Sequence, residues 1–237
     1  MKDIKRGKKV IMKKAIRILV LCLVGGVIFT AILTSASTKP NLETQVWDTR
    51  ATIGSLEAKN YYVMYTDLMC PYCDVFTREL IENEEEFEKY IEEKSVLFEV
   101  RVTAMLYDSV SEKYSKDSAV AVYCAKDEDR FFDYYHKAVM TLYEDYHSKG
   151  IGDSKTSPKI TGIPEDYWLK IGEEIGLGES FKDCVENNST WAEVRKNTTK
   201  AEQVASGLPY IVLNGEGLAG YDQSWGWQTV MDAGLKK

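Results

Sequence analysis

Two cysteines separated by Pro-Tyr, in the stretch DLMCPYCDV at residues 67–75, constrain this chain more than any other feature. The apolar run YYVMYTD at 61–67 precedes them and predicts a buried strand. Apolar residues then recur at helical spacing from Pro71 onward, which predicts one long helix. The cysteine pair therefore lies where a strand passes into a helix.

A Cys-Pro-x-Cys motif at such a junction has a chemical logic. Cys70 takes the N-cap of the helix, and Pro71 takes the first helical position, where its missing N–H is not needed. The positive end of the helix dipole then stabilises a thiolate on Cys70. Cys73, one turn further, lies behind Cys70 and resolves a mixed disulfide. We expect a solvent-accessible nucleophile at Cys70 and a redox-active disulfide with Cys73, with no other cofactor.

Two other interpretations of the pair stay open. A zinc site needs two more ligands, but Cys124, Cys184, His136 and His147 do not show the usual ligand spacing. A static disulfide across one helical turn constrains little chain entropy, so its structural value is low. The residues favour redox cycling, and we expect no bound metal.

The rest of the chain predicts an α/β fold that a block of helices interrupts. The stretch VLFEVRVTAM at 96–105 alternates in polarity and predicts a strand with one well-buried face, parallel to the first. Helical patterns without strand signals fill residues 107–205. Short strands are expected at 210–215 and 217–222, and a final helix follows.

The N-terminal segment, residues 1–38, has the pattern of an export signal. Eight basic side chains and one acidic side chain precede the apolar run at 18–33, and small residues follow at 34–37. A cleaved signal peptide and an uncleaved membrane anchor both fit this pattern. In either case the positive-inside rule places the remainder outside the cytoplasm. Residues 39–55 read as a polar linker, and 56–237 as the folded domain.

The charge of the exported part argues against one class of partner. The whole chain has a net charge of −7, and the first 36 residues carry eight basic groups and one acid, so the remainder has a net charge of −14. Nucleic-acid phosphates need a basic surface. We therefore expect no nucleic-acid partner.

Together these motifs resemble the DsbA-like thioredoxin-fold oxidoreductases. YTDLMCPYC is similar to that family's strand end and active-site motif, CAKDEDRFFDYYHKAV to its insert helices, and GLPYIVLNG to the loop and strand that carry its cis-proline. The resemblance runs from about Val63 to the C-terminus. It implies a thioredoxin fold, with a central mixed sheet flanked by helices and a large all-helical insertion at about 107–205.

The resemblance also implies roles for residues around the pair. Pro209 would be the cis-proline and lie against the cysteines, where the backbone of Leu208 can bind an extended substrate peptide. Tyr72, between the cysteines, would contact the same substrate. Pro71 and Asp67 would support the active site, Asp67 by shaping the loop or the helix start rather than by relaying protons.

A structural disulfide is expected between Cys124 and Cys184. Both lie in the predicted insertion, and no other cysteine is unassigned once Cys22 is placed in the apolar N-terminal run. Some members of the resembled family carry a similar pair. Two separate buried thiols are the alternative.

The chain departs from the family pattern at two positions. Met64 stands six residues before Cys70, where the family often has an acid on the strand beneath the site. Methionine cannot titrate, so water or a nearby polar group must serve the proton of Cys73. Leu208 replaces the Thr or Val that is common before the cis-proline, so substrate contacts there are expected to differ.

We therefore expect an extracytoplasmic thiol–disulfide oxidoreductase that forms disulfides in exported proteins. An isomerase or a reductase would use the same site, and a non-enzymatic thioredoxin-fold binding module is a further alternative. The expected partners are reduced or misoxidised exported proteins and a membrane or soluble redox partner that resets the active site. A monomer is expected.

Overall fold

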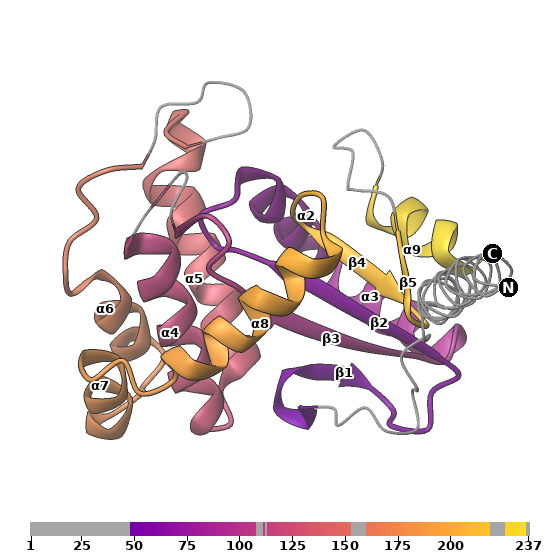
Figure 1. Ribbon diagram of the computed structural model, residues 1–237, viewed down its shortest axis with the longest axis horizontal. Coiled ribbons are helices and arrows are strands. Elements are labelled where there is room, and N and C mark those ends of the chain that lie inside the picture. The colour runs from indigo at the N-terminus through magenta and orange to yellow at the C-terminus, as the bar shows by residue number, and fades with distance from the viewer. Residues whose placement is uncertain (1–47, 108–110, 112, 153–159, 219–225, 236–237) are drawn as a thin grey trace, which may run out of the picture. The chain divides into compact units, whose positions relative to one another are not determined.

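The alternation of strand and helix patterns produces a mixed sheet flanked by helices in the computed structural model, which describes residues 48–107, 111, 113–152, 160–218 and 226–235 (Figure 1). The predicted signal or anchor segment, 1–38, lies outside these residues. Over the described ranges, no helix combines the length and the apolar character needed to cross a bilayer. The predicted fold class, a thioredoxin fold with a helical insertion, is confirmed.

Five strands form the sheet, in the order β1-β3-β2-β4-β5. Their bounds are β1 Thr52–Gly54, β2 Asn60–Thr66, β3 Val96–Val102, β4 Tyr210–Leu213 and β5 Glu216–Gly217. The predicted parallel pairing of β2 and β3 is confirmed, and every other neighbouring pair is antiparallel. The strand predicted at 217–222 is present only as the two residues of β5, and 219–225 lie outside the described part.

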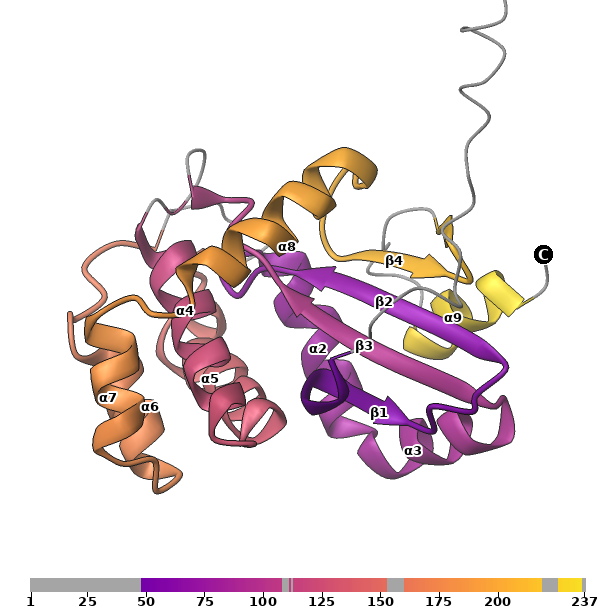
Figure 2. The ribbon, with the colours of Figure 1, turned by 60° about the horizontal axis from the view of Figure 1, so that its bottom comes forward.

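Helices cover both faces of the sheet and also form a separate group. Their bounds are α2 Pro71–Glu82, α3 Glu84–Glu93, α4 Lys113–Asp127, α5 Phe131–Asp145, α6 Tyr167–Glu174, α7 Glu179–Glu186, α8 Trp191–Val204 and α9 Trp227–Leu235, with short 3-10 turns at Thr49–Ala51 and His147–Lys149. Helices α4 to α8 follow β3 and precede β4. Figure 2 shows α2 and α3 below the sheet and α8 above it.

The two faces of β2 explain this layering. Tyr62 and Met64 point into the main core, together with Phe76 of α2 and Trp227 of α9. The alternate residues of β2 point to the opposite face and pack against Ala201 of α8. Because side chains of a strand alternate, one run of apolar residues serves both faces.

The long helix predicted from Pro71 is in fact two helices. Asn83, with φ −120° and ψ 36°, separates α2 from α3. Its side-chain amide donates to the carbonyl oxygen of Glu79 at 2.7 Å. Asparagine competes in this way with the backbone ladder, so periodicity alone missed the break.

The predicted linker, 39–55, is wrong over its last part, because residues 52–54 form β1 and pair with β3. Asp48, just before β1, binds the buried ammonium of Lys126 at 2.6 Å. Gly54 has φ 103°, and a Cβ there would lie 2.2 Å from the carbonyl oxygen of Val96. Only glycine fits such a close approach, and the short strand carries too little pattern to be predicted.

The prediction of one polar face for β3 is also wrong, because all seven residues are buried. Glu99 and Arg101 form a two-pronged ion pair, with 2.9 and 2.7 Å between donors and acceptors. Arg101 also donates to the hydroxyl of Tyr65 at 3.0 Å. A buried charge needs a partner of opposite charge, and Glu99 and Arg101 are each other's partners.

A disulfide ties the helical insertion together. Cys124 of α4 and Cys184 of α7 are joined, with 5.8 Å between their Cα atoms and a sequence separation of 60. Buried aromatic residues surround α5, and the Tyr134 hydroxyl donates to the carbonyl oxygen of Trp168 in α6 at 2.8 Å. The helices of the insertion are therefore held by a covalent link and by side chains that belong to the same continuous core as the sheet.

Candidate active site

The cysteine pair begins helix α2 directly after the loop that follows β2. Cys70 is the N-cap residue, and Pro71 opens the helix as expected. No side chain caps this helix end. Its first N–H groups and the helix dipole therefore act on the Cys70 sulfur.

Asp67 holds the loop between β2 and α2. Its carboxylate is fully buried and accepts from the backbone N–H groups of Met69 and Leu106, each at 3.0 Å, and from the hydroxyl of Ser115. Burial raises the pKa of Asp67 to about 6, against the lowering effect of these bonds. The residue thus links the active-site loop to the segment after β3 and to the first turns of α4.

Both active-site cysteines are free thiols, and both are buried, with 5% of Cys70 and 2% of Cys73 exposed. The expectation of a solvent-accessible Cys70 is therefore wrong. Part of the cover comes from the loop before β4, where the carbonyl oxygen of Leu208 lies 3.6 Å from the Cys70 sulfur. The sequence does not reveal this contact, because the two positions are 138 residues apart in the chain.

The environments of the two thiols push their pKa values apart. A hydrogen bond from the Cys73 side chain and bonds from the N–H groups of Cys73 and Tyr72 lower the pKa of Cys70, although burial and the charge of Asp67 oppose them. Burial raises the pKa of Cys73 well above its ordinary value, and a hydrogen bond from Thr66 only partly offsets this. The pair therefore consists of one acidic thiol and one that strongly holds its proton.

The Leu208–Pro209 peptide bond is cis. Pro209 is buried and Leu208 half-buried, whereas Gly207 before them is exposed. A Cβ built on Gly207 would meet nothing within 4 Å, so the chain has open space beside it. The structure thus brings the cis-proline loop to Cys70, as the resemblance implies.

Tyr72 lies on the surface, with 42% of its side chain exposed. It is one of few large apolar side chains that the described chain leaves open to solvent. An exposed aromatic next to a nucleophile is suited to contact an unfolded peptide.

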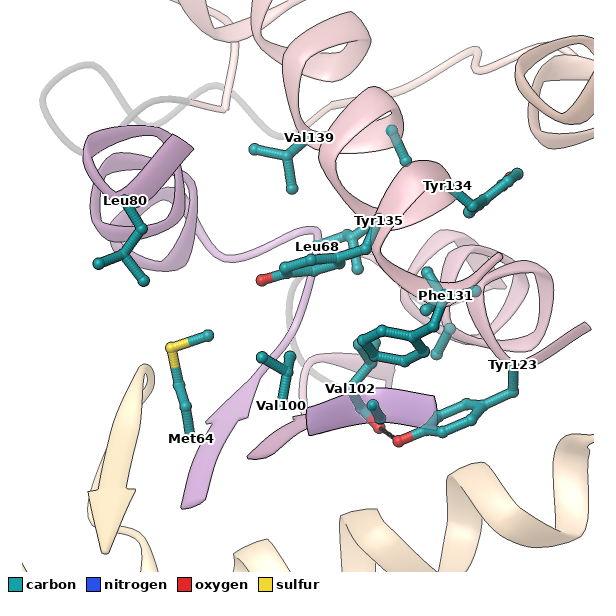
Figure 3. Close-up of a cluster of buried hydrophobic side chains, with 14 of the residues drawn as sticks. Met64, Leu68, Leu80, Val100, Val102, Tyr123, Phe131, Tyr134, Tyr135 and Val139 are labelled. Carbon is teal, nitrogen blue, oxygen red and sulfur yellow. Dashed lines mark hydrogen bonds between the residues drawn. The ribbon is translucent and has the colours of Figure 1, made fainter. Parts of the chain in front are cut away.

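Met64 packs in the apolar core and offers no titratable group to the cysteines. Its side chain is buried between β2 and α2 and lies near Val100 and Leu80 (Figure 3). Besides the Cys70 thiol, the groups that act on the pKa of Cys73 are the Thr66 side chain and the backbone N–H of Asp67. Thr66 was missed by sequence reasoning, because a threonine at a strand end is ordinary and only the fold reveals its neighbour.

Neither histidine of the insertion, His136 or His147, forms a hydrogen bond with the active-site cysteines among the bonds of the described residues. Nδ1 of His147 lies 3.3 Å from a carboxylate oxygen of Asp74, which also binds Arg78 at 3.2 Å. His136 is half-buried on α5, and burial lowers its pKa. Within the ranges that the structure describes, no group of three or more His, Cys, Asp or Glu side chains could hold a metal ion.

Alkylation of the reduced protein should modify Cys70 before Cys73. The thiolate is the reactive form, so the lowered pKa of Cys70 and the raised pKa of Cys73 give opposite reactivities. Labelling by iodoacetamide from about pH 5 to about pH 9, followed by peptide mass spectrometry, measures both rates. Cys70 should react faster at every pH, and equal rates would contradict the assignment.

Comparison with known proteins agrees with this geometry. A sequence model of the thioredoxin family, described as "Thioredoxin", matches residues 47–233. No curated protein sequence matches the chain.

Solved structures share the fold at low sequence identity. The oxidised BdbD of Bacillus subtilis has 16% identity and a TM-score of 0.58, over 78% of this chain and 91% of that one. The reduced disulfide oxidoreductase DsbG of Mycobacterium tuberculosis has 18% identity and a TM-score of 0.54, over 73% and 82%. A thioredoxin-like oxidoreductase of Silicibacter pomeroyi has 20% identity and a TM-score of 0.54, over 80% and 95%. With a matching family model over most of its length, and a helix-capping cysteine pair beside a cis-proline, the chain belongs to the thioredoxin family.

Proposed function

We propose that the chain is a thiol–disulfide oxidoreductase that introduces disulfides into exported proteins through Cys70 and Cys73. The observation that carries the proposal is the opposite pKa shift of two thiols at a helix N-terminus, beside the cis-proline loop. Stabilisation of the Cys70 thiolate favours the reduced form of the pair. It also makes Cys70 a good leaving group when a thiolate attacks its disulfide. Such a disulfide readily oxidises other thiols.

The reaction proceeds by two exchanges. A substrate thiolate attacks the Cys70 sulfur of the oxidised pair, forms a mixed disulfide and releases Cys73 as a thiolate that takes up a proton. A second substrate thiolate then attacks its own mixed-disulfide sulfur and releases Cys70 as a thiolate. The substrate loses two electrons, the pair gains them, and a redox partner must remove them again.

The cis-proline loop and Tyr72 are suited to hold the substrate. Leu208 presents its carbonyl oxygen toward Cys70, and an extended peptide beside this loop would bring its own cysteine to the same sulfur. The exposed ring of Tyr72 lies between the cysteines in sequence and offers apolar contact without side-chain specificity. This combination favours unfolded or partly folded substrates over one defined sequence.

A location outside the cytoplasm fits the same function. The Cys124–Cys184 disulfide would persist in an oxidising compartment, and the basic and apolar pattern of residues 1–38 is typical of export. The proposed substrates are reduced or misoxidised exported proteins, and a membrane or soluble partner would reoxidise the pair.

The reduction potential of the Cys70–Cys73 pair tests the direction. We expect the purified full-length protein, equilibrated in glutathione buffers, to have a potential above about −180 mV, toward the −120 mV of strong oxidants. The oxidised protein should also restore disulfides in a reduced test protein. A potential near about −270 mV, typical of reductases, would contradict the oxidase proposal.

A further inference from the structure

We propose that three buried hydroxyl groups, those of Thr66, Tyr135 and Thr77, conduct protons between Cys73 and a small cavity beside His136. This inference rests on the proposed function, because it concerns the proton that Cys73 gains and loses in each exchange. It gives the chain a proton path in place of an acid at the position of Met64.

The need for a path follows from the burial of Cys73. When the disulfide opens, the Cys73 sulfur leaves as a thiolate in a site that strongly favours the thiol, since burial raises its pKa. Only 2% of the residue is exposed. The space that Cys73 shares with Thr66, Thr77 and Tyr135 leaves about 0 Å³ for a water-sized molecule, and a bound water needs roughly 10–15 Å³. The proton must therefore come through protein groups.

The three hydroxyls form a connected chain. Thr66 and Cys73 line the same enclosed space, and the Thr66 side chain acts on the Cys73 sulfur by lowering the pKa of that thiol. The Tyr135 hydroxyl donates to the Thr66 oxygen at 3.4 Å, and the Thr77 and Tyr135 oxygens lie 2.8 Å apart. Figure 3 shows the Tyr135 ring reaching from α5 toward the helix that carries Leu80. The chain thus crosses from β2 to α5 and back to α2.

The hydrogen bonds run in the direction that transfers a proton to the Cys73 sulfur. Each hydroxyl has one proton to donate. Tyr135 gives its proton to Thr66, so Thr66 is free to donate to Cys73, and Thr77 donates to Tyr135. When one proton shifts along each bond, the Cys73 thiolate is protonated and Thr77 takes up a proton from solvent through the cavity at the outer end, so all three hydroxyls end neutral. In the reverse direction Thr77 releases a proton to solvent as the Cys73 thiol is deprotonated.

The outer end of the chain opens on a cavity. Thr77 and Tyr135 line a space of about 30 Å³ together with His136 and Glu84, which is exposed on the surface. This volume is enough for about one or two waters. His136 is held neutral at pH 7, since burial lowers its pKa, so it can both accept and donate. Protons can therefore pass between Thr77 and the surface at this cavity.

The other titratable groups near Cys73, Asp67 and Asp74, have hydrogen-bond or ion-pair partners of their own. The Asp67 carboxylate accepts hydrogen bonds from the N–H groups of Met69 and Leu106 and from the Ser115 hydroxyl, and none of these is a bond to Cys73. Asp74, one residue after Cys73, is bound by Arg78 and lies 3.3 Å from His147. Cys73 itself receives the N–H of Asp67, not its carboxylate. The three hydroxyls, by contrast, lead from the space around Cys73 to a cavity at the protein's edge.

Tyr135→Phe tests the central link, because it removes the hydroxyl and keeps the ring. The measured step is the attack of Cys73 on a Cys70–glutathione mixed disulfide, prepared on the full-length protein and followed by acid quenching and mass spectrometry across pH. We expect this step to slow at least about tenfold, as loss of a proton-transfer group does, and its rate to lose the wild-type pH profile. Thr77→Val should slow the same step in the same direction.

Tyr134→Phe is the matched control, since Tyr134 is a fully buried neighbour on α5 whose hydroxyl bonds only the Trp168 carbonyl oxygen among the bonds described. It should leave the Cys73 step within about twofold of wild type, below the effect of a lost relay group.

Two results with Tyr135→Phe would overturn the relay. One is a wild-type rate and pH profile for the Cys73 step. The other is an equal slowing of the Cys70 alkylation rate in the same variant, which signals a structural effect. If the wild-type protein performs no exchange at all, the proposed function fails instead.

Discussion

Cys70→Ser should reduce disulfide exchange to the uncatalysed background, whereas Cys73→Ser should trap the protein in mixed disulfides with its substrates. The Cys70 sulfur lies at the helix N-terminus beside the Leu208 carbonyl oxygen, and its lowered pKa makes it both the attacked sulfur and the leaving group. A serine oxygen cannot take either role, so we expect a loss of at least about three orders of magnitude in rate.

The two variants act as controls for each other. In Cys73→Ser the nucleophile Cys70 remains and can form mixed disulfides by attacking substrate disulfides, but Cys73 is no longer there to resolve them. Covalent complexes should therefore accumulate on non-reducing gels and disappear with a reductant. Both substitutions are nearly isosteric, and thermal unfolding should show similar stability for the two. Mixed disulfides formed by Cys70→Ser through Cys73 would reverse the assignment of the two roles.

Removing the disulfide in the insertion should destabilise the protein substantially. In the chain-entropy model, a bridge across 60 residues stabilises by about 4 kcal/mol, and measured values commonly fall to about 2 kcal/mol. The Cys124→Ala/Cys184→Ala double variant avoids leaving a reactive thiol in the core. Its free energy of unfolding in urea, compared with that of the oxidised wild type, gives the effect directly.

Two observations check this second expectation. A reductant opens the Cys70–Cys73 pair in both proteins but the Cys124–Cys184 bridge only in the wild type, so under reductant the wild type should lose its stability advantage over the double variant. Peptide mapping without reduction should recover the Cys124 and Cys184 peptides as one linked species. Equal stability of the two proteins, or free thiols at both positions, would show that the bridge does not contribute.

The sequence predicts those features that depend on neighbours in the chain. The strand before Cys70, the helix that Pro71 opens and the helical block before β4 all follow from local pattern and capping. The cis peptide at Pro209 and its approach to Cys70 follow only from the family resemblance, because nothing local predicts either.

Contacts between distant residues explain what the sequence missed. The charged face of β3 looked solvent-exposed, but Glu99 and Arg101 neutralise each other under α8. Cys70 looked accessible, but the loop of Leu208 covers it. The hydrogen bond between Thr66 and Tyr135 joins positions 69 residues apart. A threonine at a strand end and a tyrosine in a helix are both ordinary, so neither gives a signal in the sequence. Each of these features depends on the tertiary arrangement and leaves no periodic trace.

The shortness of the outer strands matters for the proposed action on unfolded substrate proteins. The outermost strands of the sheet have three residues in β1 and two in β5, and the carbonyl oxygen of Val102 in β3 is taken by the Tyr123 hydroxyl of the insertion at 3.1 Å. A long open strand would pair with any extended client and hold it, as aggregating proteins do. Because little strand is available for such pairing, a substrate of the proposed reaction would be held at the reactive sulfur rather than along the sheet. It can then leave once its own disulfide has formed.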